Sequence, residues 1–566
     1  MEKTSSVLAV ITIFFTFVLY PQTISAESLV LENARIYTVD KSKPWVEALA
    51  IDEDGLISAV GTSEEIKAQT KGNPVVVDLK GKMVLPGFQD LHLHAVEAGI
   101  NEILCPFEPF DTIKNFELTV LDCIDEAKPD EWILGSGVNM TYLLERHDNP
   151  VEILDKISPN RPVLILDDLG HGAWTNSIGL EAAGYDKLQN DPAGGIIIRN
   201  DKSGKPNGVV LENAQQKLRN IAFPPTPENI DFAYESLLKS LKTLAKNGIT
   251  SVSDAGGYWP QGHHQAWIRA EREKTLTVRA SNAFYIYPDL PFDEQLEKLR
   301  MLYSNDADRL VRFNQAKIYV DGILSQMTGA LLSPYPASKN LDEEKQYGFL
   351  YFEEDKLKLV AKSLSELGLQ LHFHVTGDYA ARLALDAIEG ATKMSGPHRL
   401  THLYLVDEKD FGRFAKLNVV ADFQLAPSAL ANDYKSFIKT IIGKRSKTIL
   451  PAGSIYDSGA LVTLSSDWDA DELSPLIKIE TAVSRSKNGA PDVDVAIRMM
   501  TINPAQALQQ ADRTGSIEVG KFADLVVLDK NILEIPLAQI SKAKVISTLF
   551  QGSVIYDPTN LFDDAR

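Results

Sequence analysis

The sequence predicts an α/β fold: a TIM-like (β/α)8 barrel with a small composite β-sandwich domain and one large insertion. Three observations predict it. Between about residues 86 and 510, strand-like and helix-like segments alternate, as in parallel sheets built from βα units. Eight strand-like segments occur there, the number that closes such a barrel. Short strand-like segments occupy both chain ends, and neither end alone supplies enough of them for an independent sheet.

The barrel strands are predicted from short apolar or alternating runs. They cover residues 87–94, 249–255, 278–286, 313–320, 369–375, 399–403, 419–424 and 461–466. Helical periodicity fills most of the intervals, for example residues 230–246, 292–303 and 354–367. The barrel with its loops is therefore expected over residues 86–507.

The interval after the first barrel strand is too long for one connection. We expect residues 95–248 to form an insertion with its own helices and a hairpin around Asp201–Gly204, and to cover the barrel mouth. The insertion holds the two cysteines of the chain, Cys105 and Cys123. Two cysteines alone do not establish a disulfide, and buried free thiols are the commoner outcome.

The two chain ends are expected to share one β-sandwich domain, residues 27–85 plus 508–566. Its predicted strands have turn signals between them, such as Asp54-Gly55. They cover residues 29–31, 34–37, 48–51 and 56–60 near the start, and 525–528, 545–550 and 554–556 near the end.

Residues 1–26 resemble a signal peptide. Lys3 precedes an apolar run over residues 7–20, and Ile24-Ser25-Ala26 provides a small-residue cleavage site. The run is shorter than the ~20 residues that cross a bilayer, so cleavage near Ala26 is favoured over an uncleaved anchor. The mature protein is expected to be periplasmic or secreted, without stable membrane insertion.

Composition excludes one class of partner. The chain has 566 residues and a formal net charge of −20, which argues against nucleic acid as a partner. A small-molecule substrate is expected, and a homo-oligomer is compatible with the sequence.

Side chains of the kinds that bind metal ions recur where the predicted barrel strands end. His92 and His94 are two residues apart, so a strand directs both to one face. An isolated pair of this kind is also common among ordinary surface or core residues. Here, however, Lys317, His374, His402 and Asp467 fall in or after strands four, five, six and eight. Active sites of such barrels lie at these carboxyl ends.

These stretches resemble the amidohydrolase superfamily, in the branch called amidohydrolase family 3, which includes N-substituted formamide deformylases. The similarity covers about residues 28–560. Its motifs lie at residues 78–94, 170–177, 317–322, 374–378, 461–467, 501–507 and 515–524.

The resemblance implies a metal-dependent hydrolase of non-peptide C–N bonds, such as amides or substituted formamides. His92 and His94 would bind one divalent metal, carboxylated Lys317 would bridge two, and His374 and His402 would bind the second. Asp467 would contact metal and act as general base and acid for attack by metal-activated hydroxide. The set suits zinc, one or two ions per chain, and also accepts Mn, Fe or Co.

Several of these residues have ordinary structural alternatives. Lys317 could be a salt-bridged lysine, and Asp467 could cap the following helix. His171, from the insertion, either packs in a loop or reaches the substrate. Trp468 follows Asp467 and would narrow the leaving-group side. His372, in phase with His374, is interpreted as a supporting residue.

One position departs from the family pattern: Thr401 replaces the acidic residue that usually precedes the strand-six histidine. Other histidines are expected outside the site, with His147, His263 and His264 at the surface. Two rival functions stay open. The same barrel could hydrolyse a lactone, carbamate or small peptide-like substrate, or the chain could be a metal-free scaffold or binding protein.

Overall fold

The computed structural model describes residues 29–69, 73–128, 131–336, 346–391 and 396–563. The predicted signal peptide, residues 1–26, lies outside the described residues. Within the described part of the chain, no helix combines the length and the apolar character needed to cross a membrane.

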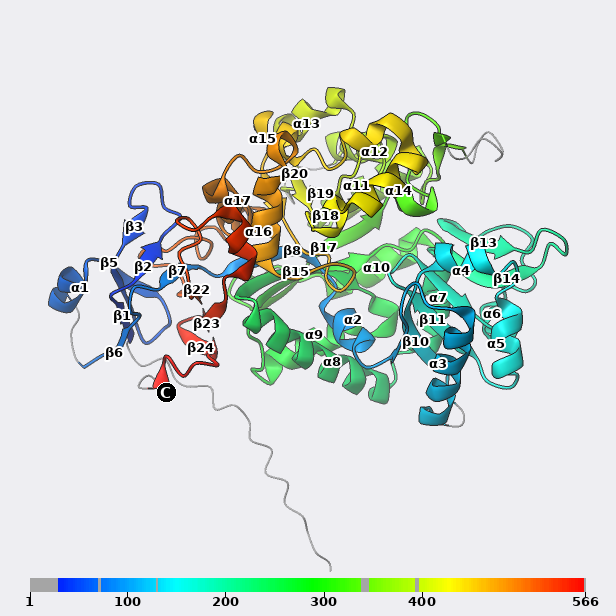
Figure 1. Ribbon diagram of the computed structural model, residues 1–566, viewed down its shortest axis with the longest axis horizontal. Helices are drawn as coiled ribbons and strands as arrows, with labels where there is room; N and C mark the ends of the chain where they lie inside the picture. The colour runs from blue at the N-terminus through cyan, green and yellow to red at the C-terminus, as the bar shows by residue number, and fades with distance from the viewer. Residues whose placement is uncertain (1–28, 70–72, 129–130, 337–345, 392–395, 564–566) are drawn as a thin grey trace, which may run out of the picture.

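Eight parallel strands form the central sheet and confirm the barrel prediction (Figure 1). Each observed strand begins and ends within two residues of its predicted bounds. In spatial order from one edge they are β21 (Val462–Leu464), β20 (Val420–Phe423), β19 (Arg399–His402), β18 (Gln370–Val375), β17 (Val311–Tyr319), β16 (Arg279–Tyr285), β15 (Ile249–Gly257) and β8 (Phe88–Leu93).

The first and last strands meet and bring the sheet close to a full barrel. Leu93 and Trp468 form a parallel bridge. The Asp467 backbone N–H donates to the His92 carbonyl at 2.7 Å, and the His94 N–H donates to the Trp468 carbonyl at 2.6 Å. The carboxyl ends of strands one and eight therefore lie side by side, where the candidate residues are.

Helices follow the barrel strands and cover the outside of the barrel (Figure 1). They are α8 (Pro227–Lys246), α9 (His263–Arg272), α10 (Phe292–Leu302), α11 (Glu354–Glu366), α12 (Asp378–Glu389), α13 (Phe411–Leu417), α14 (Asn432–Ile442), α15 (Ala452–Asp457), α16 (Pro475–Ser484), α17 (Val493–Met499) and α18 (Ile502–Ala507).

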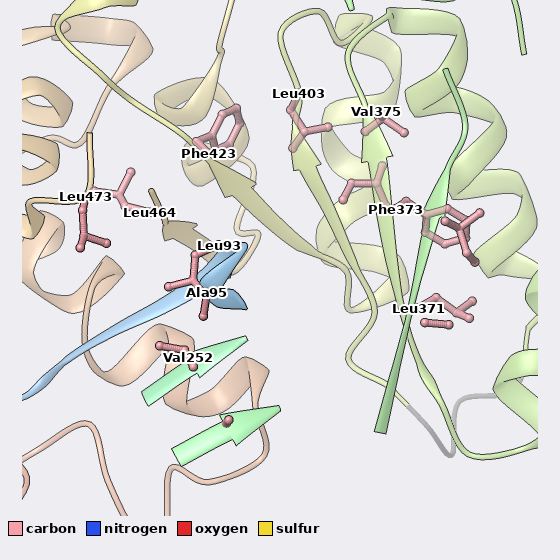
Figure 2. Close-up of a cluster of buried hydrophobic side chains, with 14 of the residues drawn as sticks. Leu93, Ala95, Val252, Leu371, Phe373, Val375, Leu403, Phe423, Leu464 and Leu473 are labelled. Carbon is pink, nitrogen blue, oxygen red and sulfur yellow. The ribbon is translucent and has the colours of Figure 1, made fainter. Parts of the chain in front are cut away.

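Alternation along the strands separates the barrel interior from the helix side. On β18, Leu371, Phe373 and Val375 belong to the main hydrophobic core, shown in part in Figure 2. His372 and His374 alternate with them and face the opposite side. The strands are buried on both faces, so a polar residue on the inner face needs a partner inside the barrel.

The insertion forms a second sheet beside the barrel. Its strand order is β13 (Gly195–Arg199), β14 (Pro206–Glu212), β12 (Gly172–Thr175), β11 (Val163–Asp167), β10 (Ile133–Val138) and β9 (Cys105–Pro106). The predicted hairpin is confirmed, because β13 and β14 pair antiparallel across the turn at Asp201–Gly204. The helices of this segment are α2 (Ala95–Asn101), α3 (Ile113–Glu126), α4 (Met140–Arg146), α5 (Val151–Ile157), α6 (Ser177–Ala183) and α7 (Ala214–Ala222).

The expectation of free thiols is wrong. Cys105 and Cys123 form a disulfide, with their Cα atoms 5.9 Å apart. Cys105 begins edge strand β9 and Cys123 lies on α3, which packs on β9 and β10. The tertiary packing of this helix brings the two sulfurs together, and no local sequence pattern reports it.

The chain ends form two further sheets. One has the order β5 (Ile57–Gly61), β4 (Ala48–Ile51), β1 (Leu29–Glu32) and β6 (Val75–Asp78). The other combines both ends, in the order β24 (Ser553–Tyr556), β23 (Val545–Phe550), β22 (Leu525–Leu528), β7 (Met83–Pro86), β2 (Arg35–Tyr37) and β3 (Trp45–Val46). Helix α1 (Ser63–Gln69) packs on β4 and β5. Because β7 runs directly into β8, this domain holds the start of the first barrel strand.

Candidate metal centre

The histidine pair that ends β8 faces Asp467 inside the barrel. Nε2 of His92 lies 3.1 Å from Oδ1 of Asp467, and Nε2 of His94 lies 3.6 Å from the same oxygen. One potential ligand atom from each of the three residues falls within 4.8 Å of the others. Two imidazoles and a carboxylate at this spacing suit a divalent ion such as zinc.

Lys317 joins this cluster from the fourth barrel strand. Its amine lies 3.0 Å from Nε2 of His92, and the side chain is fully buried. Burial lowers the pKa of the Lys317 amine from 10.5 to about 7. A substantial fraction of the amine is therefore neutral near pH 7, the form that can react with carbon dioxide.

The remaining two predicted ligands lie on the other side of Asp467. Nδ1 of His402 is 3.7 Å from Oδ2 of Asp467. The ring centroid of His402 is 4.5 Å from that of His374 and 4.8 Å from that of His92. The structure thus brings all six predicted ligand residues together at one end of the barrel.

The donor set fits a divalent metal. Burial holds the pKa values of His92 and His374 well below the ordinary histidine value and lowers that of His402 to about 3. These imidazoles are neutral, as metal ligands must be. Both ring nitrogens of His374 are buried and have no hydrogen-bond partner among the described residues. Such a state is unfavourable unless a ligand takes a lone pair.

The pKa values of Asp467 and His94 are shifted in the direction that favours their charged forms. Burial opposes ionisation of Asp467, but the His92 and His402 imidazoles outweigh it and hold its pKa well below the usual carboxylate value. Burial likewise opposes protonation of His94, but the contact with Asp467 and the hydrogen bond to Glu97 raise its pKa to about 9. Binding of a metal ion at His94 would therefore displace a proton.

Two chains of hydrogen bonds fix the orientation of the β8 histidines. Nδ1 of His94 lies 2.8 Å from Oε2 of Glu97, which also pairs with the buried Arg219 guanidinium. Nδ1 of His92 lies 2.8 Å from Nε2 of His372, whose Nδ1 lies 2.8 Å from the Arg399 guanidinium. His372 thus holds the His92 ring through Nδ1, the nitrogen that does not face Asp467.

The insertion brings His171 to the same end of the barrel. Its ring centroid lies 5.1 Å from that of His374 and 5.8 Å from that of Tyr319. Nδ1 of His171 lies 2.7 Å from Oε2 of the buried Glu212. Burial lowers the pKa of His171, but the charge of Glu212 and its hydrogen bond outweigh this and raise it. Trp468 follows Asp467 and forms a parallel bridge with Leu93 of β8. Its side chain is partly buried and packs against the main hydrophobic core.

Thr401 and His263 make contacts that the sequence does not predict. Thr401 donates to Oδ2 of Asp422 at 3.0 Å, on the neighbouring strand. Its hydroxyl therefore supports a carboxylate of strand seven. The surface prediction for His263 is wrong: the ring is buried, and Nδ1 donates to the Gly256 carbonyl at 3.1 Å. Gly262, with φ of +83°, is the residue before α9, and it directs the first residue of that helix, His263, toward the interior.

Four residues that hold the histidines of the site were not predicted from the sequence: Glu97, Glu212, Arg219 and Arg399. Glu97 had a usable signal, because it follows His94 by three residues at the start of a helix, where such pairs meet. Glu212 had none, because its contact with His171 depends on pairing between β12 and β14.

Comparisons with known proteins agree with this geometry. The model of a family described as the amidohydrolase family matches residues 75–556. N-substituted formamide deformylase of Arthrobacter pascens is 28% identical over 556 residues, covering 94% of this chain and 98% of that protein. Protein LONG AFTER FAR-RED 3 of Arabidopsis thaliana is also 28% identical, covering 93% of this chain and 91% of its own length.

A solved structure shares the fold. It is that of an uncharacterized metal-dependent hydrolase from Pyrococcus horikoshii, with a TM-score of 0.69 and 22% identity. The match covers 90% of this chain and 99% of the other.

Proposed function

Because the chain belongs to the amidohydrolase family, which is metal-dependent, we propose that it hydrolyses a non-peptide C–N bond of an amide or N-substituted formamide. One observation carries the proposal. Six residues from five barrel strands or their ends converge at one rim, with Asp467 between the His92–His94 pair and His402. A similar relative named N-substituted formamide deformylase supports the choice of substrate class.

Asp467 carries the proton transfer in this proposal. A divalent ion, zinc by preference, supplies Lewis-acid activation of water and of the substrate's carbonyl group. The ionised Asp467 accepts the proton that water loses as its oxygen bonds to the carbonyl carbon. It then delivers that proton to the leaving nitrogen as the C–N bond breaks. Its side chain is 21% exposed, so a substrate can reach it.

Lys317, carboxylated on its amine, would help to hold one or two divalent ions at this site. The supporting observations are full burial, a pKa of about 7 and a position beside His92. A buried lysine without a carboxylate in contact is unfavourable, and carboxylation turns it into an anionic oxygen ligand.

The test is a hydrolysis screen on zinc-loaded protein. Formamides, N-acyl amino acids, lactones and carbamates are offered, and turnover is expected with formamides or other amides. Asp467→Asn is expected to lose nearly all turnover while retaining metal, because the amide cannot accept the proton. Asp293→Asn, at an exposed position in the first turn of α10, serves as the matched control. Turnover of lactones alone, or full activity of Asp467→Asn, would contradict the proposal.

We also propose that the protein is exported from the cytosol. The signal-like residues 1–26 support it, and so does the Cys105–Cys123 disulfide, because disulfides persist mainly outside the cytosol. The test is the N-terminal sequence of the protein recovered from periplasm or medium. It is expected to begin at Glu27, and full-length protein confined to the cytosol would contradict export.

A further inference from the structure

Helix α3 of the insertion carries two apolar stripes on opposite sides. Phe116, Val120 and Cys123 face inward and join the core that the helix forms with β9 and β10. Leu118 and Leu121 lie on the outer side, 50% and 46% exposed. Residues three positions apart are neighbours on a helix surface, so the two leucines form one exposed apolar patch. The helix lies at the periphery of the molecule, on the side away from the sheets that the chain ends form (Figure 1).

Charged residues flank this patch at both ends. Lys114 precedes Leu118 by four positions, Asp125 follows Leu121 by four, and both charged side chains are exposed. Spacings of four, three and four positions keep all four side chains on one stripe of the helix. Within the described part of the chain, neither Lys114 nor Asp125 forms an ion pair with another side chain. The outer stripe of α3 is thus, in order, a cation, two leucines and an anion.

The two charges oppose the dipole of their own helix. Lys114 lies in the first turn of α3 and Asp125 in the last, and the helix has no acidic residue in its first turn and no basic residue in its last. The helix dipole favours the reverse placement, an anion at the amino end and a cation at the carboxyl end. These charges therefore do not serve the stability of α3, and their placement favours a role in a contact outside the helix.

The order of the residues on the outer stripe is self-complementary. If a second copy of α3 lies antiparallel to the first across a two-fold axis, Leu118 lies opposite Leu121 of the partner subunit. In the same register, Lys114 lies opposite Asp125 of the partner subunit. The symmetry produces each contact twice, so two ion pairs flank the leucines. A parallel pair would place like charges beside each other, so the charges select the antiparallel direction.

We propose that the outer stripe of α3 is the interface of a homodimer, in which α3 packs antiparallel on α3 of a second copy. A second copy is the occupant because the stripe matches itself in both its apolar and its charged residues. A membrane surface fits less well, because helices that lie on membranes carry an excess of cations. The Cys105–Cys123 disulfide ties α3 to β9, so the stripe is presented on a fixed element and little freedom is lost on binding.

The proposed interface is small. A seam of one helix on each side lies at the lower end of specific interfaces, at or below about 1,200 Å². Association is therefore expected to be reversible and to depend on protein concentration.

The experiment is sedimentation velocity of the purified protein over a range of concentrations. The wild type is compared with Lys114→Asp, with Asp125→Lys, with the two combined, and with Leu118→Ser plus Leu121→Ser. Leu359→Ser is the control, because Leu359 is a 57% exposed leucine on another helix, α11. The melting temperature of each variant checks folding. Both single charge reversals agree with the helix dipole, so neither is expected to damage α3.

The wild type is expected to dimerise. Each single charge reversal should weaken association at least about tenfold, because symmetry turns two ion pairs into two like-charge contacts. The combined variant restores both pairs with opposite polarity and should associate like the wild type. The double leucine variant should lose at least about tenfold in affinity, because it removes the apolar part of the seam. The control should associate like the wild type.

A wild type that stays monomeric up to about 100 µM, where contacts of micromolar affinity are largely formed, overturns the inference. A dimer that persists unchanged in the double leucine variant or in the single charge reversals also overturns it, because the interface then lies elsewhere. Failure of the combined variant to recover association contradicts the antiparallel pairing.

Discussion

The amine of Lys317 lies 3.0 Å from Nε2 of His92, although 225 positions separate the two residues. Both side chains are completely buried, on the fourth and first strands of the barrel. Two nitrogens that would repel each other as cations sit in contact, and burial lowers the pKa of each. Burial therefore favours the neutral form of both groups, the form in which these nitrogens can bind a cation.

Replacing Lys317 should weaken metal binding at the site. Lys317→Ala is expected to lower zinc affinity by at least about 100-fold, because loss of even an outer-shell partner costs 10–100-fold. Added acetate or propionate should restore part of the metal content and turnover by supplying the missing carboxylate. Metal analysis after dialysis, with and without the acid, checks this. Full metal content and activity in Lys317→Ala would show that the lysine is no ligand.

Glu97 should act through His94. Glu97→Gln removes the charge that holds the His94 ring and leaves Arg219 without its anionic partner. Zinc affinity is expected to fall about 10–100-fold, as for other carboxylates behind metal-binding histidines. Glu102→Gln, an exposed position just after the same helix, is the control and should keep wild-type affinity. A competition titration with a chelator measures both, and equal affinities would remove Glu97 from the site.

His263 should make the protein sensitive to acid. Burial lowers its pKa from 6.5 to about 4, so between these values the unfolded chain binds a proton that the folded chain excludes. The unfolding free energy therefore falls as pH drops from 6.5 towards 4, by about 1.4 kcal/mol per pH unit from this group. His263→Asn keeps a donor for the Gly256 carbonyl and should flatten this slope. Urea unfolding of both proteins at pH 7 and pH 5 measures it; identical slopes would contradict the assignment.

The disulfide should stabilise the insertion. It joins residues 18 positions apart, a loop for which closure entropy corresponds to about 3 kcal/mol. Cys105→Ser with Cys123→Ser is expected to lower the melting temperature, whereas added reductant should lower that of the wild type alone. Thiol titration of the unfolded protein provides the control. Two free thiols in protein secreted under oxidising conditions would contradict the pairing.

The barrel and the gathering of the candidate residues at one rim could be predicted from the sequence because both depend on where the strands begin and end. Strand periodicity located every barrel strand, and parallel strands carry their terminal residues, such as His94 and His402, to one rim. The supporting contacts depend on tertiary packing instead. Glu212 reaches His171 through antiparallel pairing in the insertion, and Cys123 reaches Cys105 because α3 packs on β9. His263 is buried by the turn at Gly262 that starts its helix.

The candidate residues at the ends of the barrel strands are expected to hold one divalent-metal centre. Anomalous diffraction at the zinc edge, on crystals of the zinc-loaded protein, locates bound zinc without reference to activity. We expect a zinc peak about 2.0–2.2 Å from a ring nitrogen of His92 and from one of His94, with Asp467 also in contact. A zinc-loaded crystal whose anomalous peaks all lie away from these residues would contradict it.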